Sequence, residues 1–315
     1  MTATSSPPRS MAPTGERELM CSALVGSNPL GFLAALGLID VLARAVPDAQ
    51  PTLRWEGTLR PQAAVGGLGE LDRVVEAVMT DRDRWNRSVV LEGPDGERPL
   101  DIKPEVDQVG PWFRAAATSE HPGDLPLLHG LISEGAVAGK GDSKPTHLHF
   151  TAGQQKFLAM VRDLRDNLTD DHVVEALIGP WRYESALPVL GWDGDRSERL
   201  HALSRKSPAS EKKLGVPGAE WLAFLGLRYL PVATTARLEL VTTCCAPAWK
   251  AGGHLTWPLW ERPAGDAAIA ALLRSDFFGL DPDQRRERGL SGVLRAPIRR
   301  ADQGGYGSFG PTSPV

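Results

Sequence analysis

The segment NPLGFLAALGLIDVLARAV, residues 28–46, constrains the fold most, because its apolar side chains surround a helical axis on almost every side. Asn28 can accept from the free amides of a first turn, and Pro29 suits the first helical position because it has no amide hydrogen. The charge of Asp40 and a length short of the roughly 20 apolar residues of a bilayer span argue against a membrane helix. We therefore predict a buried helix. Its small residues would admit a close neighbour: Gly31, Ala35 and Gly37.

A related hexapeptide occurs far along the chain. LAALGL at 33–38 and LAFLGL at 222–227 differ at one position, whereas the flanking residues do not match. A duplicated domain would extend the similarity beyond six residues. We therefore predict two helices that meet the same requirement for close packing.

Composition limits the classes of function. The chain has 315 residues, of which 42% are hydrophobic and 23% charged, as in soluble globular proteins. A net charge of −4 provides no global positive field for nucleic acid or an anionic membrane, so any such binding is local or shared with partner subunits. Three cysteines without a CxxC pattern support neither a disulfide framework nor a zinc site, which favours a reducing cytoplasm.

Periodicity predicts a mixture of elements. Strand patterns occupy 18–26 and 51–57, and helical patterns occupy 69–85, 171–178, 218–228 and 264–278. Two further strand patterns, 233–245 and 253–260, are expected to pair with each other. The predicted fold class is α+β, with mixed helices and short, mainly antiparallel strands around the buried N-terminal helix.

The predicted organisation begins with a disordered leader at 1–15. An N-terminal α/β region follows at 16–140, and a C-terminal α+β region at 141–300 begins near the glycine-rich connection 135–145. Residues 301–315 are expected to form a flexible tail. One continuous domain from 16 to 300 is the alternative.

The stretch SKPTHLHFTAGQQKF, residues 143–157, carries the first candidate site. THLHF alternates, which predicts a strand with His147 and His149 on its exposed face. Thr151 and Gln154 form a capping-box pattern at the start of a helix that runs to Leu168. The amides of that helix N-terminus, next to both histidines and Lys144, would form an anion site.

A second polar concentration lies between residues 192 and 216. Its basic residues stand beside Pro208 and several serines, which indicates an exposed loop that can contact phosphates. An ordinary solvated loop is the alternative, because acidic residues are interleaved. The candidates are Arg196, Arg199, Arg205, Lys206, Lys212 and Lys213. The arginine-rich end is of the same kind: Arg285, Arg286, Arg288, Arg295, Arg299 and Arg300.

Motifs of catalysis are missing from the sequence. It contains no GxxxxGK[ST], no GxGxxG that opens a helix after a strand, no GxSxG and no HExxH. We therefore predict no catalytic residues, no cofactor and no metal. One metal candidate can be assembled, but its members come from three segments without ligand spacing. They are His147, His149, His172, Asp193 and Asp195.

Several segments together resemble CRISPR-associated proteins of type I-G (formerly I-U) systems. They are GSNPLGFLAALGLIDVL, KPTHLHFTAGQQKFL, WDGDRSERLHALS and PGAEWLAFLGLRYLPV, spread over residues 20–235. The chain is similar to the large-subunit-like component of the effector complex. The accessory extension found with the helicase-nuclease of these systems is a related possibility, although the enzyme's own P-loop and nuclease signature are lacking.

The resemblance implies a non-catalytic cytoplasmic subunit or accessory of an RNA-guided antiviral complex. Its partners would be other CRISPR-associated proteins with guide RNA, target DNA or both, and no membrane. The residues expected to contact nucleic acid are Lys144, His147, His149 and the six basic residues from Arg196 to Lys213. Two alternatives remain: a metal-dependent nuclease that uses His147, His149, Asp193 and Asp195, and a protein-binding scaffold without nucleic-acid contact.

Overall fold

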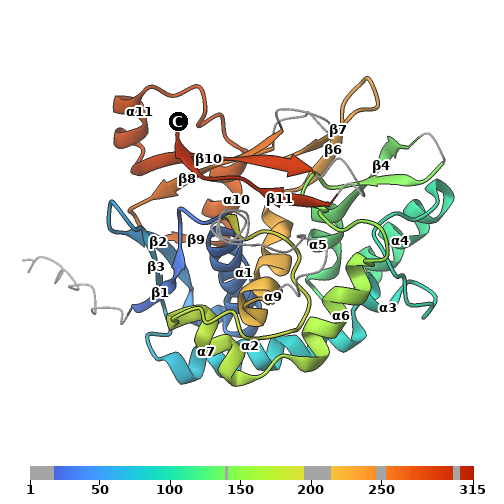
Figure 1. The fold of residues 1–315 in the computed structure, drawn as a ribbon, viewed down its shortest axis with the longest axis horizontal. Coiled ribbons are helices and arrows are strands. Elements are labelled where there is room, and N and C mark those ends of the chain that lie inside the picture. Colours follow the sequence, from blue (N-terminus) through green and yellow to red (C-terminus); the bar gives the residue numbers. More distant parts are fainter. Residues whose placement is uncertain (1–17, 139–140, 195–213, 246–252, 301–305) are drawn as a thin grey trace, which may run out of the picture.

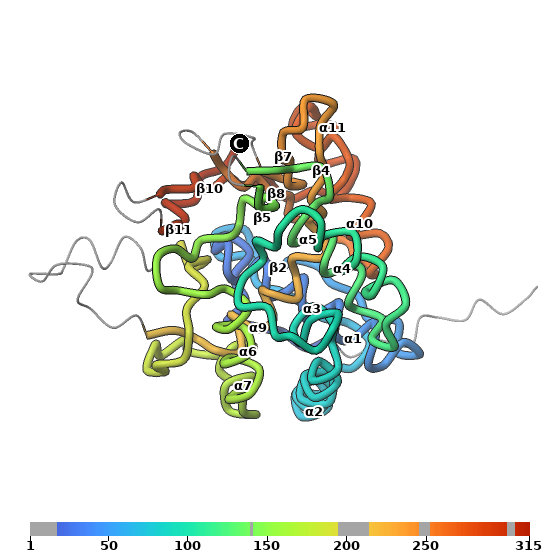
Figure 2. The backbone as a smooth tube through the Cα atoms, turned by 90° about the vertical axis from the view of Figure 1, so that its right-hand side faces the viewer, coloured from blue at the N-terminus to red at the C-terminus, as the bar shows by residue number. Residues whose placement is uncertain are grey.

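A computed structural model describes residues 18–138, 141–194, 214–245, 253–300 and 306–315. Helices and small antiparallel sheets alternate, which confirms the predicted α+β class. Two helices cross the centre, with one sheet beside them, a second sheet above and further helices below and to the other side (Figure 1). The turned view in Figure 2 shows the same central position of this pair. The predicted leader, 1–15, lies outside the described residues.

Helix α1 (Pro29–Ala45) is the predicted buried helix. The Asn28 side chain accepts from the Leu30 amide at 2.9 Å, and Pro29 occupies the first turn, as the cap pattern predicts. Every residue from Pro29 to Leu42 is buried. None of the described helices has the combination of length and hydropathy that a bilayer crossing requires.

Helix α9 (Pro217–Gly226) packs directly against α1, and the two related hexapeptides form the contact. A Cβ atom on Gly37 would overlap the Leu222 carbonyl, and a Cβ atom on Gly226 would overlap the Leu33 carbonyl. The glycine of each hexapeptide thus faces the first leucine of the other, in a pseudo-twofold arrangement. Close packing therefore accounts for the similarity of the two segments.

The first sheet has the order β1 (Leu19–Val25), β3 (Gln62–Gly66), β2 (Thr52–Glu56) and β9 (Ala264–Gly265). Its β1 and β2 confirm the strands predicted at 18–26 and 51–57. Trp55 of β2 and Phe32 of α1 have ring centroids 6.0 Å apart, so this sheet covers one side of α1.

The predicted pairing of 233–245 with 253–260 is present only at its end, where Cys245 and Leu255 form a single antiparallel bridge. In the second sheet, β8 (His254–Trp260) pairs with β10 (Leu290–Arg300), while β6 (Val232–Thr234) and β7 (Leu240–Thr242) form a hairpin of their own. β10 also pairs with β11 (Gly307–Phe309) and β12 (Ser313–Pro314). Residues 306–315, which we expected to be a flexible tail, are thus held by the sheet, and Phe309 is fully buried.

The remaining helices surround the central pair. α2 (Leu71–Arg84) and α7 (Asp170–Ile178) lie below it in Figure 1, and α10 (Asp266–Arg274) follows β9. On the right-hand side are α3 (Val89–Glu92), α4 (Val106–Thr118), α5 (Asp124–Leu131), β4 (Ile132–Val137), β5 (Ser143–Pro145) and α6 (Phe157–Asn167). α11 (Pro282–Glu287) lies beside β10. Single turns of 3-10 helix occupy η1 (Pro47–Ala49), η2 (Trp85–Arg87) and η4 (Leu227–Tyr229).

A buried ion-pair network joins the end of α1 to its neighbours. Asp40, which is 1% exposed, pairs with Arg44 of its own helix and with Arg228 directly after α9. Arg44 also binds Asp81 of α2 at 2.8 Å, and Arg228 binds Asp266 of α10 at 2.5 Å. Each buried charge therefore has an opposite charge beside it, as burial requires.

We expect Gly37→Ala and Gly226→Ala each to lower the free energy of unfolding by about 3 kcal/mol or more, because backbone atoms on the facing helix cannot move aside. The double variant should lose less than the sum of the two, since one separation of the helices accommodates both methyl groups. Urea unfolding measures these values. Gly292→Ala is the control, because no atom lies within 4 Å of its Cβ position. Full additivity of the two losses would contradict a shared contact.

Candidate nucleic-acid interface

The residues Thr146–Phe150 form a turn and not the predicted strand. β5 ends at Pro145, and the His149 amide donates to the Thr146 carbonyl at 3.1 Å, which closes the turn. The Thr146 amide donates to the Leu131 carbonyl at 2.7 Å, so the turn is fixed to the end of α5. Both histidines are buried, with exposures of 4% for His147 and 1% for His149. The predicted exposed histidine face is therefore wrong.

His147 is held by Thr242 of β7. Its amide donates to Thr242 Oγ1 at 3.1 Å, and its Nδ1 lies 2.8 Å from the same oxygen. Burial lowers the pKa of His147 to about 4, and the positive charge of Arg300 acts in the same direction. The imidazole is therefore neutral at pH 7 and adds no positive charge for a phosphate.

His149 is held by an acidic residue. Its Nε2 lies 2.8 Å from Asp101 Oδ1 and 2.9 Å from Thr151 Oγ1, and its ring packs against Phe157 with centroids 5.3 Å apart. Burial lowers the pKa of His149 in spite of the opposing effect of Asp101. Burial acts to raise the pKa of Asp101, but the hydrogen bond and charge of His149, the Ile102 amide and the charge of Lys103 together outweigh it, so the pKa is lowered. At neutral pH a neutral imidazole therefore binds a carboxylate here.

Arg300, the last residue of β10, binds the turn from outside. It donates to the His147 carbonyl at 3.0 Å and to the His149 carbonyl at 3.2 Å, and its guanidinium carbon lies 5.5 Å from the Phe150 ring centroid. The end of β10 therefore fixes a turn about 150 residues earlier in the chain. This arginine was among the phosphate candidates of the C-terminal group, but its described contacts are internal to the fold.

The predicted anion site at the following helix is not present as expected. α6 begins at Phe157, without a side-chain cap, so the capping box of Thr151 and Gln154 is wrong. The amides of Leu158 and Ala159 both donate to the Leu100 carbonyl, at 3.0 and 3.2 Å. Two of the amides that the anion site required are thus occupied by the protein itself.

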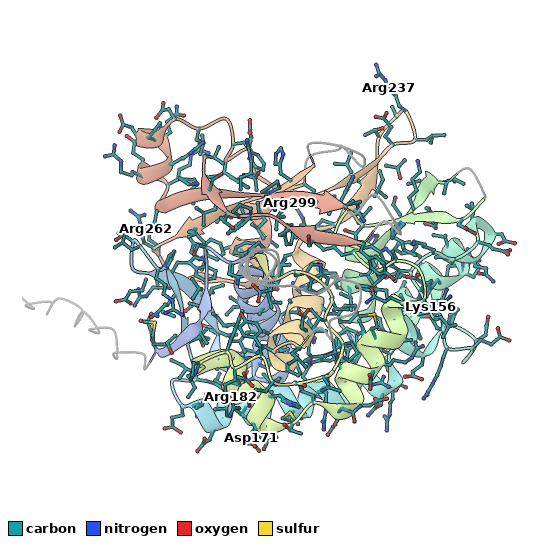
Figure 3. All side chains as sticks on the ribbon, in the orientation of Figure 1. Lys156, Asp171, Arg182, Arg237, Arg262 and Arg299 are labelled. Atoms are coloured by element: carbon teal, nitrogen blue, oxygen red, sulfur yellow. The ribbon has the colours of Figure 1, made fainter. Side chains whose placement is uncertain are left out.

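Apart from the two histidines, Lys144 is the one expected nucleic-acid contact that falls within the described residues. It lies half-buried on β5, and its ammonium group makes no ion pair with any residue in the described ranges. The six basic residues from Arg196 to Lys213 lie outside the described residues, so their role stays a prediction. In the C-terminal group, Arg285 donates to the Val315 carbonyl at 2.7 Å and Arg286 pairs with Asp283. Arg299 is exposed and lies on the second sheet (Figure 3).

The metal candidates do not assemble in the described part of the chain, where no three His, Cys, Asp or Glu side chains are grouped for a metal ion. His172 caps α7 together with Thr169. The carboxylate of Asp193 accepts from Asn28 and from the Tyr183 hydroxyl, each at 2.8 Å. Asp195 lies outside the described residues.

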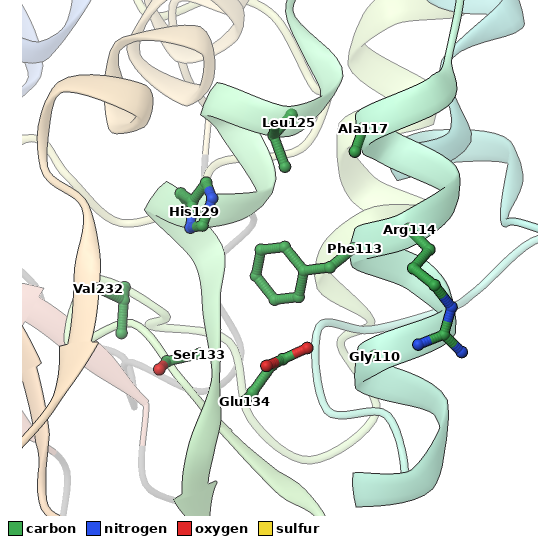
Figure 4. A pocket seen from close by; sticks show the side chains of 9 residues that line it. All are labelled: Gly110, Phe113, Arg114, Ala117, Leu125, His129, Ser133, Glu134 and Val232. Carbon is green, nitrogen blue, oxygen red and sulfur yellow. The ribbon is translucent and has the colours of Figure 1, made fainter.

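One cavity has no signal in the sequence. A pocket of about 480 Å³ lies between α4 on one side and α5, β4 and β6 on the other (Figure 4). Its walls combine aromatic, apolar and charged groups. No motif marks it, because its residues come from separate elements and their spacing matches no known pattern. The lining residues are Gly110, Phe113, Arg114, Ala117, Leu125, His129, Ser133, Glu134 and Val232.

Comparisons with family models, with curated proteins and with solved structures found no match to this chain.

The lowered pKa of His147 predicts a loss of stability in acid. Above pH 6.5 the His147 imidazole is neutral in both the folded and the unfolded chain. Between pH 6.5 and pH 4 the unfolded chain binds the proton more readily than the folded chain, so the free energy of unfolding falls. At pH 5 this loss is at most about 2 kcal/mol. Urea unfolding at pH 7.5 and pH 5.0 should show a smaller difference for His147→Asn than for the wild type.

The control is Gln108→Asn at an exposed position on α4, which exchanges one neutral amide for another. Because no ionisable group changes, its pH dependence should equal that of the wild type. An unchanged pH dependence in His147→Asn would contradict the assignment of this proton to His147.

Proposed function

We propose that the chain is a non-catalytic subunit or accessory of a type I-G CRISPR RNA-guided complex, and that it acts in the cytoplasm through assembly with protein partners and contact with nucleic acid. The observation that carries the proposal is that the segments with the family resemblance meet around one residue, Phe157. Its ring centroid lies 6.1 Å from that of Phe224 and 6.2 Å from that of Trp192. Trp192 in turn donates to the Leu148 carbonyl at 2.9 Å.

The N-terminal segment joins this group through the contact of α1 with α9. Three stretches that are far apart in the sequence, together with residues 192–194 of the fourth, are thus parts of one packed centre. This supports the resemblance as a property of a whole fold, in which one segment constrains the next. A likeness limited to one isolated helix would carry less weight.

The charge of the chain fits a subunit better than an independent binder. With a net charge of −4 it cannot attract a polyanion over its whole surface. In an assembly, neighbouring subunits supply most of the positive field, and base pairing with the guide reads the sequence. We assign the chain's own phosphate contacts to Lys144 and to the six basic residues between positions 196 and 213. The buried, neutral histidines then position the segment that carries Lys144.

The test is the salt dependence of DNA binding by the assembled complex. Changing Arg196, Arg199, Arg205, Lys206, Lys212 and Lys213 together to Ala should weaken binding at low salt. The slope of log K against log[salt] should fall by about 0.7 to 0.9 for each phosphate contact removed. The control changes six exposed arginines elsewhere and leaves the slope unaltered. These are Arg60, Arg73, Arg84, Arg87, Arg262 and Arg274.

Two outcomes would overturn the proposal. If the protein copurifies with partners but neither guide nor target crosslinks to it, it is a scaffold. If the pure chain cleaves labelled DNA or RNA with magnesium, manganese or zinc, and His149→Ala abolishes the cleavage, it is a nuclease.

A further inference from the structure

The pocket between α4 and β4 has the size and lining of a small-molecule site. Its volume of about 480 Å³ lies within the range of about 300–1,000 Å³ of such sites, which combine apolar walls with a few polar groups. Phe113 projects into the middle of the pocket, below Leu125 and between His129 and Glu134 (Figure 4). A ligand in this pocket would therefore contact the aromatic ring of Phe113.

The aromatic groups favour a flat ligand. The rings of Phe113 and His129 have centroids 4.8 Å apart and are tilted by 45°. Burial lowers the pKa of His129, although the nearby carboxylate of Glu134 opposes the shift. At neutral pH the pair therefore presents two uncharged rings. Stacking on such rings is how proteins bind single nucleobases.

The two charged groups of the pocket form no ion pair with each other. Arg114 Nη1 and Glu134 Oε1 lie 3.4 and 3.5 Å from the Cβ position of Gly110, so both approach the same point on α4. Both residues are exposed, and neither side chain has a hydrogen bond or ion pair with another described residue, so each is open to a ligand from solvent. A carboxylate only accepts hydrogen bonds, and a guanidinium only donates them.

We propose that this pocket binds an unpaired guanine nucleotide. Guanine has two adjacent N–H donors on one edge, which match the two oxygens of the Glu134 carboxylate, while the base stacks on Phe113 and the phosphate binds Arg114. The inference rests on the proposed contact with nucleic acid, since it assigns one base of a bound strand to a specific place. Adenine has one amino group and no neighbouring ring N–H on that edge, so it fits less well.

The test is a ligand-observed NMR titration of the free full-length chain with GMP, IMP and AMP. GMP should bind more tightly than IMP, which lacks the exocyclic amino group, and more tightly than AMP. Glu134→Gln should weaken GMP binding about tenfold or more, because an amide replaces one acceptor by a donor, and should change AMP binding less than twofold. Phe113→Leu should weaken binding of all three nucleotides.

Two further variants make the test specific. Gly110→Ala adds a methyl group at ordinary contact distance from both charged groups, so it narrows the pocket without disturbing the fold, and GMP binding should fall. Glu239→Gln, an exposed position on the β6–β7 hairpin, should leave it unchanged. Absence of saturable GMP binding, or equal binding by Glu134→Gln, would overturn the inference. Binding of N-acetylarginine amide in place of GMP would overturn it too, because the pocket would then accept a basic side chain of a protein.

This titration uses the chain without partners, so its result is independent of the salt experiment on the complex. If the complex binds DNA through the chain's basic residues but the pocket does not bind GMP, only the pocket proposal is refuted. GMP binding by the chain, together with an unaltered salt slope in the six-residue variant, refutes the assigned phosphate contacts and leaves the pocket in place.

Discussion

The fold depends on the contact of two helix backbones at Gly37 and Gly226. With no side chain between them, α1 and α9 approach until the glycine of each meets a leucine carbonyl of the other. α1 has apolar groups on almost all sides, so it is stable only when other elements enclose it. The first sheet, α2 and α9 do so, and the paired charges of Asp40 and Arg228 fix where the two helices end relative to each other.

The polar cluster around the two histidines fixes the position of their turn more than it supplies reactive groups. Thr242, Asp101 and Arg300 bind it from three different parts of the chain. Each bond satisfies a buried polar group, and together they hold β5 and the start of α6 in a fixed relation. Lys144 lies on β5, which pairs with β4, and β4 carries Ser133 and Glu134 of the pocket, so the two proposed binding functions share one support.

Sequence patterns predicted the parts of the fold that depend on local interactions. The all-round apolarity and cap of α1 and the amphipathic spacing of α2 are such signals. β10 was missed because Gly292 and Pro297 interrupt its pattern, and its partner β8 lies about 30 residues away. THLHF has the alternation of a strand, but hydrogen bonds to Thr242 and Arg300 decide its conformation, and neither is visible locally. The pocket of Phe113 and Glu134 likewise arises from tertiary structure alone.

The glycine contact also has a consequence for synthesis in the cell. Gly226 leaves the ribosome about 190 residues after Gly37, which at about 5–20 residues per second is a delay of roughly 10 to 40 s. Throughout that interval α1 lacks its closest partner and keeps part of a fully apolar surface open. Contacts between such distant positions also form slowly in the complete chain. The nascent protein therefore has a long period in which chaperones can bind it, and its final assembly is a late, cooperative event.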